Sequence, residues 1–269
     1  MYVIKASGKK EEFDPEKILR TLLRAGASRN LANDIVSQVK SKIHDLITTR
    51  EILDMALDLL KNKQPEVGAR YDLKRAIMNL GPTGFPFEQF FAEILRYYGY
   101  KTKVGQTVQG KITDHEVDVI AEKNSEKYMI ECKYHNSLGV YTNIRVALYI
   151  YARFLDLKKK FKQPWLSTNT KCSTKAILYA KGVGMKITSW KYPKNESLQE
   201  LIEKKNLYPI TILKSVNNNI KTKLSKAGIM LAKNLINYDL NELKKKIKLP
   251  ENVLKKILDE CKGVCNVKL

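Results

Sequence analysis

Residues 127–134 have the sequence KYMIECKY, which predicts a β-strand. Alternate side chains of a strand point to the same face, so the apolar ones are expected in the core and Glu131 and Lys133 together on the opposite face. A second predicted strand, EVDVIA at residues 116–121, carries Asp118. A hairpin of the two strands would bring two carboxylates and one ammonium group to one place.

These three side chains suit one kind of chemistry. Two carboxylates can hold a hard divalent cation such as Mg²⁺ or Mn²⁺. A lysine beside them can orient a water molecule or stabilise the negative charge that develops on a phosphate. Asp118, Glu131 and Lys133 therefore predict metal-dependent hydrolysis of phosphodiesters. The competing interpretation is a solvent-facing strand edge with paired charges, which a lysine-rich chain produces easily.

Composition narrows the class of partner. The chain has 269 residues, 43% of them hydrophobic, which is enough for two or three packed domains and argues against disorder. Its net charge of +21 favours a polyanionic partner, and nucleic acid is the commonest one. The alternative is a solvated lysine-rich surface with no such partner.

The cysteine pattern and the apolar segments point to a cytoplasmic protein. The four cysteines lack the spacing of a zinc site, so we expect reduced thiols. The first residues lack the apolar core of a signal peptide, and no apolar run approaches the ~20 residues needed to cross a bilayer. We therefore expect no membrane association.

Glycine and proline divide the chain. The segment GPTGFP at residues 81–86 stops a helix and predicts a linker. We predict domains at residues 1–84, 85–213 and 214–269. The fold class is multidomain α/β: a mainly helical first domain, an α/β core with a mixed sheet, and a small all-α tail. The tail has 13 lysines against five acidic residues, a net charge of +8.

Periodicity and caps predict the elements within these domains. In the first domain they are a strand over 2–6 and helices from 15, over 30–43, 49–60 and 71–79. In the second they are helices over 88–98 and 140–158, and strands over 101–109, 114–122, 127–134, 176–180 and 186–189. Trp165 and Trp190 are expected in the core.

The order of motifs in the middle region is informative. A helix opens at Phe87-Glu88, and the motifs HEVDV (115–119) and IECK (130–133) follow. Over much of residues 87–190 the chain resembles the Mrr-like restriction endonucleases of the PD-(D/E)xK superfamily. The resemblance implies that Asp118 and Glu131 bind metal and that Lys133 is catalytic.

Two further residues of this region have open roles. The resemblance implies that Glu88 corresponds to a helix acid that reaches the metal in some relatives, with Glu93 as the alternative. His115 is interpreted as flanking structure, with contact to DNA as its other possible role.

The first region also carries recognisable motifs, VIKASG at 3–8, FDPEKI at 13–18 and TTREI at 48–52. Over about residues 2–80 it resembles an ATP-cone, the regulatory nucleotide-binding module of ribonucleotide reductases. The resemblance implies that ATP or dATP binds at positions in the motifs, namely Val3, Lys5, Lys17 and Thr49. Ammonium groups and a helix N-terminus both attract a triphosphate. The alternative is a helical domain that serves only for protein contacts.

The tail resembles paired helix-hairpin-helix modules. LSKAGI at 224–229 is the better hairpin, because a glycine turn lets backbone N–H groups approach DNA phosphates. The second candidate, IKLPE at 247–251, has proline and no glycine. The alternative is a small helical cap that only packs.

Together these features predict a metal-dependent DNA endonuclease regulated by an adenine nucleotide. Cutting both strands of a duplex would favour a homodimer. The competing hypothesis is a non-catalytic, nucleotide-responsive DNA-binding protein that keeps a nuclease fold as a scaffold.

Overall fold

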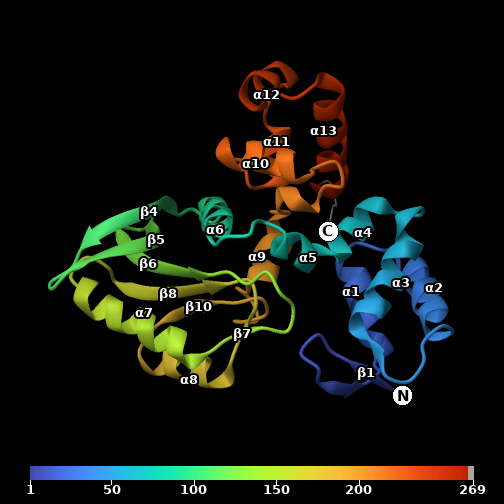
Figure 1. Cartoon of the computed structure of the whole chain (residues 1–269), viewed down its shortest axis with the longest axis horizontal. Coiled ribbons are helices and arrows are strands. Elements are labelled where there is room, and N and C mark those ends of the chain that lie inside the picture. The colour runs from blue at the N-terminus through green and yellow to red at the C-terminus, as the bar shows by residue number, and fades with distance from the viewer. Residues whose placement is uncertain (266–269) are drawn as a thin grey trace.

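The computed structural model describes residues 1–265 and has the predicted multidomain α/β architecture. Figure 1 shows a helical N-terminal part beside a central sheet, with a helical C-terminal part above their junction. No helix among the described residues is long and apolar enough to span a membrane. All four cysteines are free, and Trp165 and Trp190 are buried as predicted.

The N-terminal part packs helices around a small sheet of order β2-β1-β3. Its strands are β1 (Tyr2–Ile4), β2 (Lys10–Glu12) and β3 (Ile47–Thr48). Its helices are α1 (Pro15–Arg24), α2 (Arg29–Lys40), α3 (Thr49–Lys61) and α4 (Pro65–Tyr71). Asp14 caps α1 through the backbone N–H of Glu16, and Thr48 forms a capping box with Glu51 at the start of α3.

The helix predicted over 71–79 is present in shorter form, and another short helix that was not predicted directly precedes it. Helix α4 ends at Tyr71 and α5 (Leu73–Met78) begins after Asp72. Leu73 and Ile77 of α5 lie outside the core of the N-terminal part and pack in the neighbouring core. The break therefore lets the chain pass from one apolar core to the next.

The central part is a five-stranded mixed sheet of order β10-β8-β6-β5-β4. Its strands are β4 (Lys101–Gln109), β5 (Asp114–Lys123), β6 (Glu126–Lys133), β8 (Gln163–Thr168) and β10 (Lys186–Thr188). The first three are antiparallel, and β8 and β10 continue parallel to β6.

Helices cover both faces of this sheet (Figure 1). On one face lies α6 (Phe85–Tyr97), whose Phe91 meets the ring of Trp165 edge-on at 5.7 Å. On the other face lie α7 (Ile144–Leu157) and α8 (Thr174–Gly182), which bury Ile150 and Ala176 against the sheet. The face that was expected to expose Glu131 is therefore covered.

One element prediction in this part was wrong, and a second was correct except for its first residues. The strand expected over 176–180 is part of α8, which begins after the cap Ser173 and buries Ala176 and Ala180, four residues apart. The helix expected over 140–158 begins only at Ile144. Before it, β7 (Tyr141–Thr142) pairs with β9 (Lys171–Cys172).

The C-terminal part is helical, as predicted. It follows α9 (Leu198–Lys205) and a 3-10 turn, η1 (Ile210–Ile212), and comprises α10 (Asn218–Lys226), α11 (Ala232–Ile236), α12 (Leu240–Ile247) and α13 (Glu251–Cys265). Two turns join consecutive helices. Gly228 has a φ of 73° in the first, and Lys248 takes the left-handed conformation at 54° in the second, which lacks the glycine of the helix-hairpin-helix pattern.

The C-terminal helices do not form a core of their own. Leu224 and Ile257 belong to the same buried cluster as Ile77 of α5 and Phe90 of α6. This continuous core crosses both predicted domain boundaries, after residues 84 and 213.

Candidate functional site

The hairpin of β5 and β6 builds the candidate site. Its turn, Asn124-Ser125, has positive φ values of 52° and 63°, as two-residue hairpin turns require. The register pairs Val119 with Ile130. The ladder ends at this pair, and the charges of Glu131 and Lys133 act on Asp118 just beyond it, so the hairpin brings the three side chains near one another as the sequence predicted.

Asp118 is held against the neighbouring strand. Its Oδ2 accepts a hydrogen bond from the backbone N–H of Cys132 at 2.7 Å. Burial, and then the nearby charge of Glu131, raise the pKa of Asp118 to about 6. Two carboxylates thus share a partly desolvated space.

Glu131 is only 5% exposed and carries a cation on each carboxylate oxygen. Lys133 Nζ lies 2.7 Å from Oε1, and Arg153 of α7 lies 2.5 Å from Oε2. The Tyr149 ring, one turn earlier on α7, lies 5.8 Å from the Lys133 ammonium and 5.3 Å from the Arg153 guanidinium.

Sequence reasoning missed Arg153 and Tyr149. No spacing rule connects them to Glu131, because they come from a helix that the fold places over the sheet. The only available signal was the predicted helix itself, whose covering of a sheet face could have been anticipated from the α/β pattern.

The two candidate acids of α6, Glu88 and Glu93, have different surroundings. Burial, and then the charges of Asp118, Glu116 and Glu131, raise the pKa of Glu88 to about 7. Glu93 instead accepts a hydrogen bond from Asn234 Nδ2 of α11 at 2.6 Å. Glu93 therefore connects α6 to the C-terminal part, and Glu88 is the acid on the side of the hairpin.

The donor set fits a hard cation. Asp118 and Glu131 offer carboxylate oxygens, with Glu88 beside them. Among residues 1–265, no three His, Cys, Asp or Glu side chains form a ready-made metal cluster. Mg²⁺ does not need one, because it keeps several waters and binds through one or two carboxylates.

His115 lies near this site but is engaged elsewhere. Its Nε2 contacts Asp156 Oδ2 at 2.9 Å. The same carboxylate accepts hydrogen bonds from the backbone N–H groups of Ile112 and Thr113, at 2.8 and 3.2 Å. Asp156 thus holds the loop between β4 and β5, and His115 contributes to that anchor.

The four predicted nucleotide-binding residues lie in the N-terminal part. Val3, Lys17 and Thr49 line a cavity of about 840 Å³, whereas Lys5 is outside its lining. Lys5 and Lys17 both form ion pairs with Glu11. The hydrogen bonds from Lys17 and Lys5 lower the pKa of Glu11 to about 2.

Fold and site together define a restriction-endonuclease-like protein with two appended modules. Three family models match the chain, an ATP cone domain at 1–78, a restriction endonuclease domain at 82–194 and the AF1548-like C-terminal domain at 208–265. They bear out the predicted architecture.

One curated relative matches along almost its whole length. It is an uncharacterized protein of Archaeoglobus fulgidus, 42% identical over 174 residues, covering 64% of this chain and 98% of the relative. The chain therefore belongs to the AF1548-like family.

Solved structures agree with this assignment. The crystal structure of AF1548, a protein of unknown function, superposes with a TM-score of 0.62 and 40% identity, covering 68% of this chain and 98% of that one. Can2 from Sulfobacillus thermosulfidooxidans, solved with cyclic tetra-adenylate, is 12% identical with a TM-score of 0.34, over 73% of this chain and 64% of that one. That likeness is too low to bear on the function of this chain.

Proposed function

We propose that this protein is a metal-dependent DNA endonuclease whose activity is regulated by ATP or dATP bound at the cone. The observation that carries the proposal is the convergence of Asp118, Glu131 and Lys133 at one end of the β5–β6 hairpin. The match to the restriction endonuclease family over residues 82–194 supports it.

Each residue has a role in this proposal. Asp118 and Glu131 hold Mg²⁺ or Mn²⁺, with Glu88 as a further oxygen donor. A bound divalent ion would polarise the phosphate and lower the pKa of a coordinated water. Lys133, already aligned on Glu131, donates hydrogen bonds to a water or to a phosphate oxygen on which charge develops.

The proposed substrate is DNA, and the net charge of +21 supports a polyanion. A homodimer would allow both strands to be cut. The nucleotide acts as a regulatory ligand, and Val3, Lys17 and Thr49 around the cavity support a site for it there.

One observation favours a second candidate function. Both oxygens of Glu131 are already occupied by cations, as they would be in a purely structural ion-pair network. A non-catalytic, nucleotide-responsive DNA-binding protein would keep that network and never cleave.

A plasmid-nicking assay with and without Mg²⁺ or Mn²⁺ separates the two. The wild type should nick only with metal, and Asp118→Asn, Glu131→Gln and Lys133→Met should each lower the rate roughly 100-fold or more. DNA binding should persist and can tighten in the first two variants, which remove negative charge. Glu122→Gln, on β5 with Asp118 and outside the site, is the control. Nicking by Glu131→Gln at the wild-type rate would refute the assigned site.

A further inference from the structure

The cavity that holds Val3, Lys17 and Thr49 is not confined to the cone. Its lining continues onto Trp190 and Lys191, which follow β10. These two residues belong to the segment matched by the restriction endonuclease family, which ends at 194. The cavity therefore lies in the seam between the two modules.

The far wall of the seam is well anchored. The backbone N–H of Trp190 donates to Thr170 O at 2.9 Å, and the ring is buried. Ser189 N–H donates to Tyr192 O at 2.7 Å, which closes a tight turn around Lys191. Lys191 is thus presented to the cavity by a rigid support.

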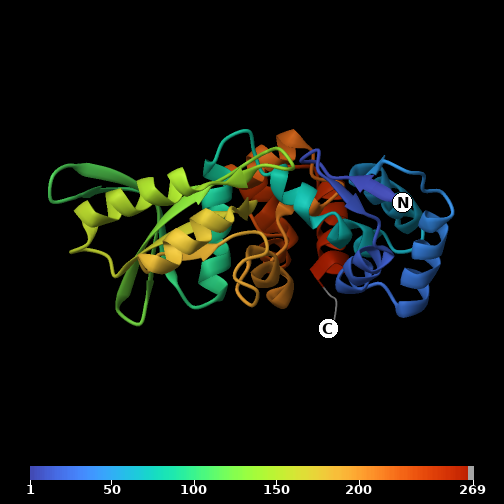
Figure 2. The ribbon, with the colours of Figure 1, turned by 90° about the horizontal axis from the view of Figure 1, so that it is seen from below.

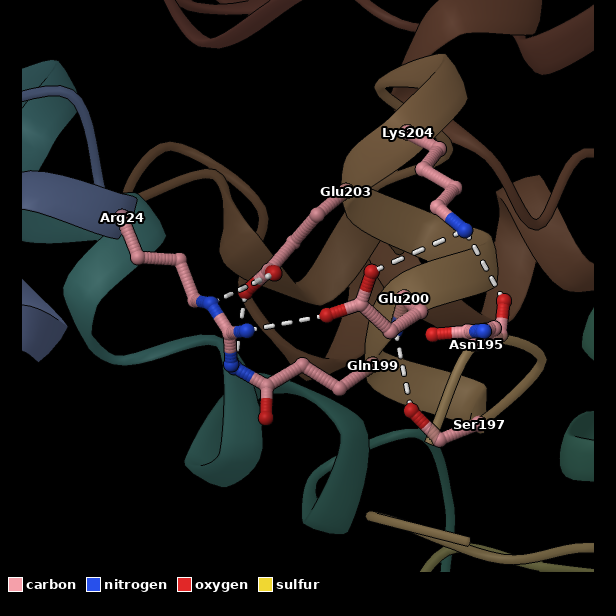
Figure 3. A network of polar contacts seen from close by, with 7 residues as sticks. All are labelled: Arg24, Asn195, Ser197, Gln199, Glu200, Glu203 and Lys204. Carbon is pink, nitrogen blue, oxygen red and sulfur yellow. Dashed lines mark hydrogen bonds and ion pairs between the residues drawn. The ribbon is translucent and has the colours of Figure 1, made fainter. Parts of the chain in front are cut away.

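An ion-pair network holds the seam together, as Figure 3 shows. Arg24 of α1 reaches α9, where it lies 2.8 Å from Glu200 and 3.3 Å from Glu203. Arg24 and Glu203 also line the cavity. On the side of the cavity lined by Arg24 and Glu203, the positive and negative side chains are therefore paired with each other.

The cations around the cavity divide into two groups. Lys17 and Arg20 of α1 are paired, with Glu11 and Asp14. In the part of the chain that the structure describes, neither Lys74 nor Lys191 lies within ion-pair distance of a carboxylate. Positive charge thus faces the cavity from both modules, and Glu203 is a carboxylate in the same lining whose charge acts on Lys191.

Lys74 is itself surrounded by other positive charges. Its ammonium lies 5.8 Å from the centre of the Trp190 ring. Burial, and then the charges of Lys171 and Lys191, lower the pKa of Lys74 to about 8. Positive charges that crowd one another in this way are stabilised when an anion binds among them.

We propose that the nucleotide site is completed by the catalytic module, with the phosphates of the ligand held across the seam between Lys74 and Lys191. This inference rests on the proposed binding of a nucleotide at the cone and adds the second wall of its site. Because the ligand then contacts both modules, binding and docking of the modules stabilise each other, and the coupling is reciprocal.

Calorimetry on the full chain tests this inference with ATP, AMP and adenosine. Lys191→Met keeps most of the stem and removes the charge, and Lys194→Met, in the turn that follows and outside the lining of the cavity, is the matched control. Lys191→Met should weaken ATP about tenfold or more, as expected for a hydrogen bond to a charged group. The loss should shrink for AMP and vanish for adenosine, and Lys194→Met should bind like the wild type.

The outcomes separate this inference from the proposed function. If Lys17→Glu abolishes ATP binding while Lys191→Met binds normally, the cone binds nucleotide alone and the seam proposal is overturned. If both lysine-to-methionine variants weaken ATP equally, only general charge is involved and the proposal also fails. If the wild type binds no ATP, the nucleotide function and the seam proposal fail together.

Discussion

Glu131 is a buried carboxylate with two cationic partners of unequal exposure. The Arg153 side chain is 11% exposed, whereas Lys133 is 35% exposed. A charged hydrogen bond is worth more where water cannot compete, and a buried charge that loses its partner is costly. Arg153 therefore contributes mainly to the stability of the fold, and Lys133 remains available for catalysis.

Arg153→Met should therefore lower the free energy of unfolding by about 1–3 kcal/mol, because Glu131 loses its most buried partner. Lys133→Met should cost less, since water can replace its ammonium. Urea denaturation of both variants measures the difference. A larger loss for Lys133→Met would contradict this division of roles.

A second prediction concerns the contribution of Glu93 to the pH dependence of folding stability. Burial raises its pKa to about 7, above the ordinary 4.5, while hydrogen bonds from Met230 and Leu231 oppose the shift. The folded state then binds the proton more tightly than the unfolded state. The stabilisation is complete below pH 4.5 and is lost as the pH rises through 7, an effect on the order of 3 kcal/mol.

Urea denaturation of the wild type and Glu93→Gln at pH 5 and pH 8 isolates this residue from Glu88 and Asp118, which titrate in both proteins. The wild type should lose stability relative to the variant as the pH rises. A difference between the two proteins that stays constant with pH would show that Glu93 does not titrate in this range.

At the scale of elements, the loop after β6 touches the cone. Gly139, six residues beyond Lys133, has a φ of 85°. A Cβ at this position would lie 2.9 Å from Ala6 O and 3.0 Å from Ser7 N, in the turn between β1 and β2. Figures 1 and 2 show the two loops side by side. The strand that carries Glu131 and Lys133 thus leads directly to the cone.

Gly139→Ala should separate these loops, because both the backbone conformation and the contact exclude a side chain. We expect a cost of about 1–2 kcal/mol and faster hydrogen exchange at the Ser7 and Gly8 amides. Gly182→Ala is the control, since nothing lies within 4 Å of its Cβ position. Unchanged exchange at Ser7 in Gly139→Ala would show that the contact does not hold the turn. If the cone regulates cleavage through this contact, ATP should also change the nicking rate less in Gly139→Ala than in the wild type.

The C-terminal helices share a core with the rest of the protein, so the proposed DNA-binding role of the tail cannot be tested by deleting it. Deleting residues 214–269 would strip Leu224 and Ile257 from the cluster that includes Phe90, so the remainder should not fold stably. Surface lysines offer a cleaner test. Lys223 Nζ of α10 donates to Lys248 O at 3.1 Å, which links the first helix of the tail to its second turn.

Replacing Lys226, Lys245 and Lys248 together by glutamine should weaken binding to all DNA duplexes alike. Each lost phosphate contact should reduce the salt dependence of log affinity by about 0.9. Binding titrations at several salt concentrations measure this slope. The control replaces Lys158, Lys159 and Lys160, exposed lysines at the end of α7, and removes the same charge. Equal slopes for the two triple variants would argue against a phosphate-binding tail.

Local patterns in the sequence determined much of this protein. Alternation along two strands and the short turn between them were enough to bring Asp118 and Glu131 together, since hairpin register depends on nearby residues. The local helical patterns likewise predicted that α1 begins at residue 15 and α3 at residue 49. The apolar run at 176–180 was ambiguous, because so short a run fits either a strand or a buried helix.

The tertiary structure alone decided which distant residues meet. Arg153 binds Glu131 and Asn234 binds Glu93, which joins residues separated by 22 and 141 positions. No periodicity links such pairs, because helix and strand repeats extend only over a few residues. Their contacts arise when apolar faces of separate elements pack into shared cores. The hydrophobic effect that drives this packing is non-directional. Side-chain shapes and buried charges select one arrangement among those that it allows.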